Sequence, residues 1–255
     1  RKDLRKRGFQ VAGCFALDEA DGRAWALKND VPYFDCVCRM DDHVDYYMVL
    51  APSNPELHLD LCRIVFPFGK PTYVDKTFAP DLKTAKKIFA MADRCCAKIQ
   101  TTSALRYSPV QEYVKTVGGP KLRHMVAWGA GRSFGEYAIH PTELVVSCMG
   151  PDATRLMRRG NADQSQLLID FSKGRTAVIN VYVGADTPFA ASVTTDRGTR
   201  YIDVGDCPMF RDNASAVLDF FTSRKPNVDR RESLMIRRIL DAANDPKALK
   251  GFVRL

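Results

Sequence analysis

The sequence predicts an α/β domain built on a parallel sheet, followed by an α+β domain with a large, mostly antiparallel sheet. Within residues 45–79, a strand, a helix and a second strand follow one another, which is typical of a right-handed βαβ unit. From Lys121 onward, β-rich runs separated by short turns replace this alternation, which favours strands paired with their chain neighbours. A Gly-Gly-Pro cluster ends at Pro120, where the pattern changes. We therefore expect one domain at residues 1–117 and another at residues 118–255.

Before the βαβ unit, the patterns predict the end of a helix, a strand, a second helix and a short strand. These elements occupy residues 1–7, 9–18, 19–30 and 31–35. In a dinucleotide-binding unit, an acid at the end of the second strand holds the ribose hydroxyls, about 20 residues after a glycine-rich loop. Counting back from Asp18 places that loop before Arg1, so we expect this domain to be N-terminally incomplete. Truncation, further residues upstream and a protein without the loop are the three open explanations.

The βαβ unit begins with an apolar run over residues 45–52, which predicts a buried strand. A helix follows, with Ser53 and Asn54 as candidate N-caps, and residues 68–70 end it. Residues 71–79 supply the next strand. In open α/β sheets, ligands bind beyond the carboxyl ends of the strands. Those ends carry Pro52-Ser53-Asn54 and Asp75-Lys76-Thr77.

The remaining elements follow from apolar periodicity and turn signals. Residues 80–95 predict an amphipathic helix, and residues 98–109 a strand and turn that close the first domain, with a linker after them. The apolar stripe of this helix consists of Leu82, Ala85, Ile88, Phe89 and Ala92. In the second domain we expect strands at 122–130, 165–172, 175–184, 189–196 and 199–205, and helices at 141–150, 213–223 and 229–244. Asp229 is a good N-cap for the last helix, and Glu232 completes a capping-box pattern.

The chain carries a net charge of +8, which would permit an anionic partner. Its basic residues are scattered, apart from short runs at residues 1–7 and 224–231. Neither run is interleaved with aromatic side chains, so both indicate solvated surface, and we expect no nucleic-acid partner.

The eight cysteines do not form a disulfide framework that the sequence reveals. Cys14, Cys62 and Cys148 lie in apolar runs, where a free thiol behaves as a small apolar side chain. The pairs Cys36-Val-Cys38 and Cys95-Cys96 lack the spacing of a zinc site, so we expect no metal. No apolar run reaches membrane-spanning length and no signal peptide is visible, so we expect a cytoplasmic protein without a membrane partner.

The segment APSNPELH, followed by GKPTYVDKTFAP, resembles the core of the Gfo/Idh/MocA family of nicotinamide-dependent sugar and cyclitol dehydrogenases. That family shows a Pro-Asn turn, a histidine one helical turn later and a Glu-Lys-Pro strand end. This chain has Asn54, His58 and Asp75-Lys76-Thr77, so its acid is shorter and its proline is replaced. The resemblance continues through residues 103–108, 136–143 and the C-terminal half. It implies a Rossmann-type domain, an α+β domain and hydride transfer between NAD(P) and a sugar, polyol or cyclitol hydroxyl.

Three residues are the candidate catalytic groups. Lys76, at a strand end, can bond a substrate hydroxyl and stabilise negative charge on its oxygen; the alternative is a surface lysine. Glu136 and His140 are four residues apart, which places them on one face of a helix. A histidine can accept the hydroxyl proton because its ordinary pKa lies near neutrality; the alternative is a histidine that caps or packs the helix. Family members carry Asp-x-x-x-His here, so the longer Glu136 either orients the ring or shares in substrate binding.

The resemblance also implies the residues that line the cofactor and substrate sites. Cofactor contacts are expected from Asp18, Pro52, Ser53, Asn54, Asp75 and Lys76, and substrate contacts from Arg106, Tyr107, Arg132 and Tyr137. Asp18 favours NAD over NADP, because a carboxylate repels a 2′-phosphate. His58 is expected to be structural, bonded to a backbone group. The run from Gly129 to Gly135 has G-x-G-x-x-x-G spacing, so we interpret it as a flexible loop at the substrate mouth rather than a phosphate-binding loop.

A second class of function stays open at this point. A non-catalytic regulatory or ligand-binding protein on the same fold would account for the absent glycine loop and for Asp75 and Thr77 in the signature strand. In the family, the open face of the second sheet commonly forms the subunit interface. The resemblance therefore implies a homodimer or homotetramer through the C-terminal sheet, with a sugar or polyol as the small-molecule partner.

Overall fold

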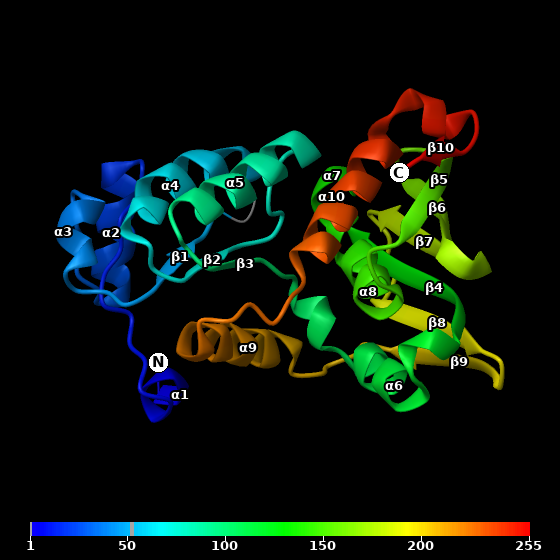
Figure 1. Ribbon diagram of the computed structural model, residues 1–255, viewed down its shortest axis with the longest axis horizontal. Helices are drawn as coiled ribbons and strands as arrows, with labels where there is room; N and C mark the ends of the chain where they lie inside the picture. The colour runs from blue at the N-terminus through cyan, green and yellow to red at the C-terminus, as the bar shows by residue number, and fades with distance from the viewer. Residues whose placement is uncertain (1, 52–53) are drawn as a thin grey trace.

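Two separate sheets organise the chain in the computed structural model, which describes residues 2–51 and 54–255 (Figure 1). The first is a parallel three-stranded sheet in the order β1-β2-β3. The second has seven strands in the order β10-β5-β6-β7-β4-β8-β9, and only its β4–β7 pair is parallel. The predicted fold class, a parallel α/β sheet followed by a mostly antiparallel α+β sheet, is confirmed.

The predicted βαβ unit forms the centre of the first sheet. Strands β1 (Tyr47–Val49) and β2 (Thr72–Val74) pair in parallel, and β3 (Ile99–Gln100) pairs with β2. The connection between β1 and β2 contains η1 (Pro55–Leu57), α4 (His58–Val65) and η2 (Phe66–Phe68). Gly69 ends it with φ of 68°, a left-handed conformation that a glycine adopts without steric cost.

Helix α5 (Leu82–Arg94) covers this sheet together with α4 (Figure 1). Its N-cap Asp81 accepts a hydrogen bond from the backbone N–H of Thr84. Ala85, Ile88, Phe89 and Ala92 are all buried, as the predicted stripe requires, whereas Leu82 is partly exposed. They pack with Val49, Val74 and Cys62 into the core of the first domain.

The first 45 residues differ most from prediction. Helices α1 (Lys2–Lys6), α2 (Glu19–Asn29) and α3 (Val37–Asp41) form, of which α3 was not predicted. The strands predicted at 9–18 and 31–35 are wrong beyond one parallel bridge between Cys14 and Tyr33. On its N-terminal side the pairing stops because Pro32, which accepts from Cys14, has no N–H to extend the ladder.

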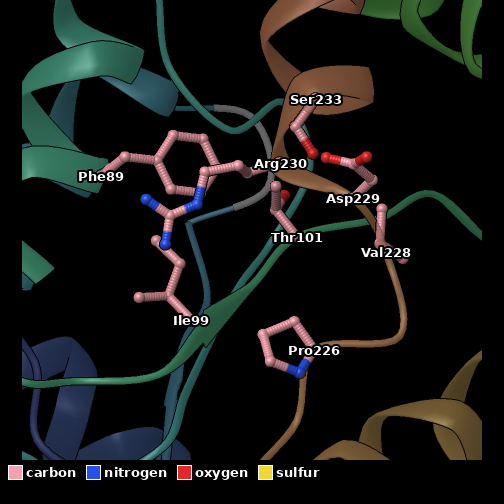
Figure 2. A pocket seen from close by; sticks show the side chains of 8 residues that line it. All are labelled: Phe89, Ile99, Thr101, Pro226, Val228, Asp229, Arg230 and Ser233. Atoms are coloured by element: carbon pink, nitrogen blue, oxygen red, sulfur yellow. The ribbon is translucent and has the colours of Figure 1, made fainter. Parts of the chain in front are cut away.

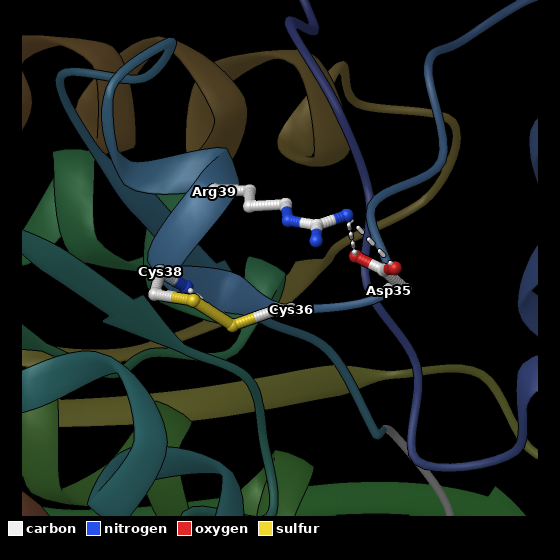
Figure 3. Close-up of a disulfide and its surroundings, with 4 residues drawn as sticks. All are labelled: Asp35, Cys36, Cys38 and Arg39. Atoms are coloured by element: carbon white, nitrogen blue, oxygen red, sulfur yellow. Dashed lines mark hydrogen bonds and ion pairs between the residues drawn. A yellow bond between two sulfur atoms is a disulfide. The ribbon is translucent and has the colours of Figure 1, made fainter.

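Cys36 and Cys38 are joined by a disulfide at the start of α3, with their Cα atoms 5.3 Å apart (Figure 3). The spacing of the cysteines in the sequence did not predict this pairing. Figure 3 also shows Arg39 paired with Asp35 beside it. Cys14, Cys62 and Cys148 are free thiols, as predicted, and the last two are buried.

The second sheet contains every strand predicted for this domain. The strands are β4 (Leu122–Gly131), β5 (Ala153–Gly160), β6 (Gln164–Phe171), β7 (Thr176–Val183), β8 (Ala190–Thr195), β9 (Gly198–Asp203) and β10 (Val253–Arg254). Strands β5 and β10 were missed. Three arginines interrupt the apolar pattern of β5, and β10 is only two residues long.

In the described part of the chain, five helices follow β3, and the first of them contains most of the predicted linker. They are α6 (Pro109–Val117), α7 (Phe134–Tyr137), α8 (Ile139–Met149), α9 (Met209–Ser223) and α10 (Arg230–Asn244), with 3₁₀ turns η3 (Ala104–Tyr107), η4 (Gly119–Lys121), η5 (Ser172–Gly174) and η6 (Pro246–Leu249). A capping box of Ser108 and Gln111 starts α6. This helix packs on α8, β8 and β9, so it lies with the second sheet.

Helices α9 and α10 return to the first domain, as the resemblance implied (Figure 1). Arg230 pairs with Asp93 of α5, and Asp241 accepts from the backbone N–H of Leu82. The capping box predicted for α10 is wrong in part. Asp229 does cap the helix, by accepting from the N–H of Arg231, but the side chain of Glu232 pairs with Arg106.

Candidate active site at the junction of the two sheets

Asp75 and Lys76 follow β2 directly, at the carboxyl edge of the parallel sheet. The backbone N–H of Asp75 donates to Val49 of β1 at 3.0 Å, which anchors the start of this turn. Both side chains are partly exposed. Burial raises the pKa of the Asp75 carboxyl, while Lys76 and His58 act in the opposite direction. The first domain therefore presents a cation and a carboxyl at the strand end where ligands bind in such sheets.

His140 approaches this edge from the second domain, in the first turn of α8. Its Nδ1 lies 2.8 Å from the Oγ of Ser103, and the rings of Tyr137 and Phe189 meet it edge-on at 5.8 Å between centroids. Burial lowers the pKa of His140 to about 4, with a further contribution from the charge of Lys76. The charge of Lys76 thus acts on the imidazole of His140, and a shared catalytic site for the two residues stays a prediction.

The pKa of His140 thus lies below the ordinary histidine value on which the sequence-based expectation was founded. Partial burial of the imidazole and the positive charge of Lys76 both disfavour imidazolium. His140 is consequently neutral at physiological pH, which leaves one of its nitrogens free to accept a proton.

Two glycines of β4 make room for the rings around His140. A Cβ on Gly131 would overlap the ring of Tyr137, and a Cβ on Gly129 would lie 2.9 Å from the ring of Phe189. Side-chain packing therefore explains these glycines. They belong to strand β4 rather than to the predicted flexible loop, because β4 continues to Gly131.

Of the predicted second-domain residues, Glu136 and Tyr137 lie on α7, one helical turn before His140, and Arg132 is exposed after β4. Tyr137 contacts the imidazole, whereas the hydrogen bond to Nδ1 comes from Ser103. The roles of Glu136 and Arg132 stay predictions.

Arg106 and Tyr107 lie in η3 and are partly buried. The Arg106 guanidinium pairs with Glu143 at 2.9 Å and with Glu232 at 2.6 Å, and its side chain is 12% exposed. Burial raises the pKa of Tyr107 to about 12. Arg106 thereby joins η3 to α8 and α10, a structural link that the substrate-binding prediction did not include.

The predicted cofactor residues of the first domain have mixed outcomes. Pro52 and Ser53 lie outside the described residues. Asn54 precedes η1, but its side chain makes no capping hydrogen bond, so that part of the prediction is wrong. Asp18 caps α2 by accepting from the N–H of Asp21 at 2.9 Å. His58 is fully buried with Nδ1 3.0 Å from the carbonyl of Phe78, which confirms its structural role.

Sequence reasoning missed Ser103, Glu143 and Phe189. Glu143 is buried on α8, where it accepts from the hydroxyl of Thr102 at 2.9 Å and from the N–H of Ser103 at 2.7 Å. One signal was available: an acid within an apolar helix, three residues after His140 and on the same face. Ser103 and Phe189 carry no local signal for their role.

A cavity of about 200 Å³ lies between α5, β3 and the start of α10 (Figure 2). Phe89, Ile99, Thr101, Pro226, Val228, Asp229, Arg230 and Ser233 line it. No candidate catalytic residue contributes to it. Among the described residues, no helix has the length and apolar character to cross a bilayer, and no cluster of three or more His, Cys, Asp or Glu side chains could bind a metal.

Comparison with known proteins finds solved structures that share this fold. No family model matches the sequence, and no curated protein matches it. Among solved structures, GenD2 from gentamicin A biosynthesis, in complex with NAD, has a TM-score of 0.81 at 14% identity, over 96% of this chain and 89% of GenD2. The scyllo-inositol dehydrogenase of Lactobacillus casei has a TM-score of 0.79 at 12% identity, over 96% and 90%.

A candidate NADPH-dependent oxidoreductase from Desulfitobacterium hafniense has a TM-score of 0.83 at 13% identity, over 99% of this chain and 92% of that protein. At such identities the likeness shows the fold. The chain has the two-domain fold of nicotinamide-dependent dehydrogenases, as its resemblance to Gfo/Idh/MocA proteins predicted.

Proposed function

We propose that the chain is a nicotinamide-dependent oxidoreductase of the Gfo/Idh/MocA type, acting on a hydroxyl of a sugar, polyol or cyclitol. The observation that carries this proposal is the electrostatic interaction between Lys76 and His140, which come from different domains: the positive charge of Lys76 contributes to the lowered pKa of the imidazole. Interconversion of an alcohol and a ketone demands charge stabilisation on oxygen and a place for a proton. A cation beside a neutral imidazole supplies both. The GenD2–NAD complex and the inositol dehydrogenase, which share the fold, support this choice.

The carboxyl edge of the parallel sheet fits a nicotinamide cofactor. Such a cofactor, when bound, accepts or supplies the hydride. Asp75 and Lys76 follow β2 there, and Asn54 follows β1 on the neighbouring connection, so an amide, a cation and a carboxyl are available to hold it. We favour NAD over NADP, because the carboxylate of Asp18 would repel a 2′-phosphate.

The protein's own groups handle the reacting oxygen and its proton. In alcohol oxidation, Lys76 donates a hydrogen bond to the substrate oxygen and stabilises the negative charge that develops on it. His140 accepts the proton at Nε2, since Nδ1 is bonded to Ser103. In carbonyl reduction, the imidazolium returns that proton from Nε2. Because burial keeps the ring neutral, Nε2 need not lose a proton before it accepts one.

A non-catalytic ligand-binding protein on the same fold is the second candidate. The observation that favours it is the neutral hydroxyl at Nδ1 of His140, which stabilises imidazolium less than a carboxylate would. Asp75 and Thr77 also depart from the Glu-Lys-Pro strand end. Such a protein would bind a polar ligand beside Lys76 without turnover.

Calorimetry with NAD and NADP, followed by absorbance assays on inositols, hexoses and nucleotide sugars, separates the two candidates. Turnover that His140→Ala abolishes would support the oxidoreductase. Ligand binding without turnover on any substrate of the panel would favour the second candidate. Because the glycine-rich loop is expected before Arg1, the decisive protein carries that upstream segment, and failure of such a protein to bind either cofactor would overturn the proposed oxidoreductase.

A further inference from the structure

Ser103 lies where the parallel sheet meets helix α8, between β3 and η3. It is 1% exposed. Its backbone N–H donates to Glu143 at 2.7 Å, and its Oγ accepts from the N–H of Leu105 at 3.4 Å. The first bond ties the residue to the second domain, and the second caps η3. These two bonds give the hydroxyl a set position relative to α8.

The same hydroxyl meets His140 at 2.8 Å from Nδ1. The rings of Tyr137 and Phe189 limit where the imidazole can lie, but edge-on aromatic contacts do not distinguish its two nitrogens. The hydrogen bond does distinguish them. Because Ser103 holds Nδ1, Nε2 is the nitrogen that remains for a reacting oxygen.

The chemistry at Nε2 determines what Ser103 has to do. A neutral imidazole accepts a proton at Nε2 only when its own proton sits on Nδ1, and that N–H then needs an acceptor. We propose that Ser103 is the positioning residue of the site, with its Oγ accepting the Nδ1–H of His140 so that the Nε2 lone pair faces the substrate oxygen. This inference rests on the proposed function for the choice of tautomer and for its role in turnover, and on geometry for the hydrogen bond between Ser103 and Nδ1.

The test uses the tautomer and the pKa of His140, read from long-range ¹H–¹⁵N spectra of the labelled protein. The chain has four histidines, so replacing each in turn assigns the signals. In Ser103→Ala we expect a smaller Nδ1–H fraction and a lower pKa than in the unmodified protein, because imidazolium loses an acceptor. Ser103→Thr, which keeps the hydroxyl, should restore both. Turnover should fall up to about 100-fold in the alanine variant and recover in the threonine variant.

Ser147→Ala is the matched control. Ser147 lies on α8, the helix that carries His140. Its hydroxyl accepts a hydrogen bond from the Gln111 amide at 2.8 Å and donates one to the carbonyl of Leu144 at 3.0 Å. Its loss should leave the His140 signals and turnover unchanged. The proposal is overturned if Ser103→Ala keeps the Nδ1–H fraction and pKa of the unmodified protein, or if Ser147→Ala alters them equally. If Ser103→Ala moves the signals as expected and no substrate turns over in any variant, the positioning role stands and the proposed function fails.

Discussion

Strands of two or three residues make up the parallel sheet, whereas the second sheet contains strands of up to ten. The smaller sheet leaves apolar side chains partly in solvent: Met48 and Leu50, on and beside β1, are 52% and 57% exposed. In the larger sheet, Leu167, Ile169 and Ile179 are almost completely buried under α8 and α10.

The difference shows that the two domains build their hydrophobic cores in different ways. Part of the core of the smaller sheet comes from the C-terminal region of the chain, because Tyr73 of β2 packs on Val217, Phe220 and Phe221 of α9. The larger sheet builds its own core and holds α8 in place. Lys76 comes from the first region and His140 from the second, so the proposed site exists only while the junction holds. The following experiments probe each side of that junction.

The largest effect is expected on the side of the larger sheet, at His140. His140→Ala should lower turnover by about 10²–10⁴, because the substrate proton loses its acceptor. Steady-state kinetics measure this, and calorimetry should show little change in NAD affinity. Near-normal turnover in this variant would place the base on another residue.

Titration of His140 should also make stability and the oxidation rate depend on pH. Its folded pKa of about 4 lies below the ordinary 6.5, so between those values the unfolded chain binds a proton that the folded chain does not. Stability should therefore fall as the pH drops from about 6.5 to about 4, and His140→Ala should reduce that loss. In the pH–rate profile of alcohol oxidation, the fall in rate caused by protonation of His140 should lie near pH 4 and not near neutrality. Urea unfolding and pH–rate profiles test the two statements.

The junction itself is the next target. Glu143→Gln removes the charge that faces Arg106 in a buried setting and should cost about 3–5 kcal/mol of stability. Glu232→Gln is the matched control, since Glu232 bonds the same guanidinium but is more exposed, at 19% against 4%, and should cost less. Equal costs in urea unfolding would show that burial does not set the strength of this link.

On the side of the smaller sheet, Lys76→Ala should lower turnover by about 10²-fold, because a donor to the developing oxyanion is lost. Substrate affinity should weaken as well, while Lys76→Arg, which keeps the positive charge, should retain part of the activity. Initial-rate measurements at several substrate concentrations separate the two parameters. Unchanged turnover and substrate affinity in the Lys76→Ala variant would contradict the proposed site.

A smaller effect should distinguish the glycines of the β4–α7 segment. Gly131→Ala places a methyl group against the ring of Tyr137 and should cost about 1–3 kcal/mol, whereas Gly135→Ala meets nothing within 4 Å and lies in a helix. The second change should be neutral or stabilising by up to about 1 kcal/mol. Thermal unfolding of both variants tests whether packing, rather than loop flexibility, explains the glycines.

The smallest effect concerns Asp18, in the least regular part of the chain. Asp18→Asn keeps a side chain that can cap α2 and removes only the charge. Discrimination against NADP should fall by about fivefold, the scale of one solvent-exposed charge pair. An unchanged ratio of kcat/KM for the two cofactors would show that Asp18 does not face the ribose.

Prediction from sequence succeeded where local signals agreed. The apolar run before Pro52, the break at Gly69 and the stripe of α5 each depend on neighbours within a few residues, so the βαβ unit was predictable. The two strands before residue 36 failed because strand pairing needs a partner that continues, and Pro32 stops it.

The sequence by itself determined the two-sheet organisation, the helix faces and, through a family resemblance, Lys76 and His140 as candidates. Only the tertiary structure decided what surrounds them. Ser103 lies 37 residues before His140 along the chain, and Glu143 bonds a residue 40 positions away. Secondary structure follows from interactions between near neighbours, whereas the burial, hydrogen-bond partner and pKa of a side chain depend on distant segments that only the folded chain brings together.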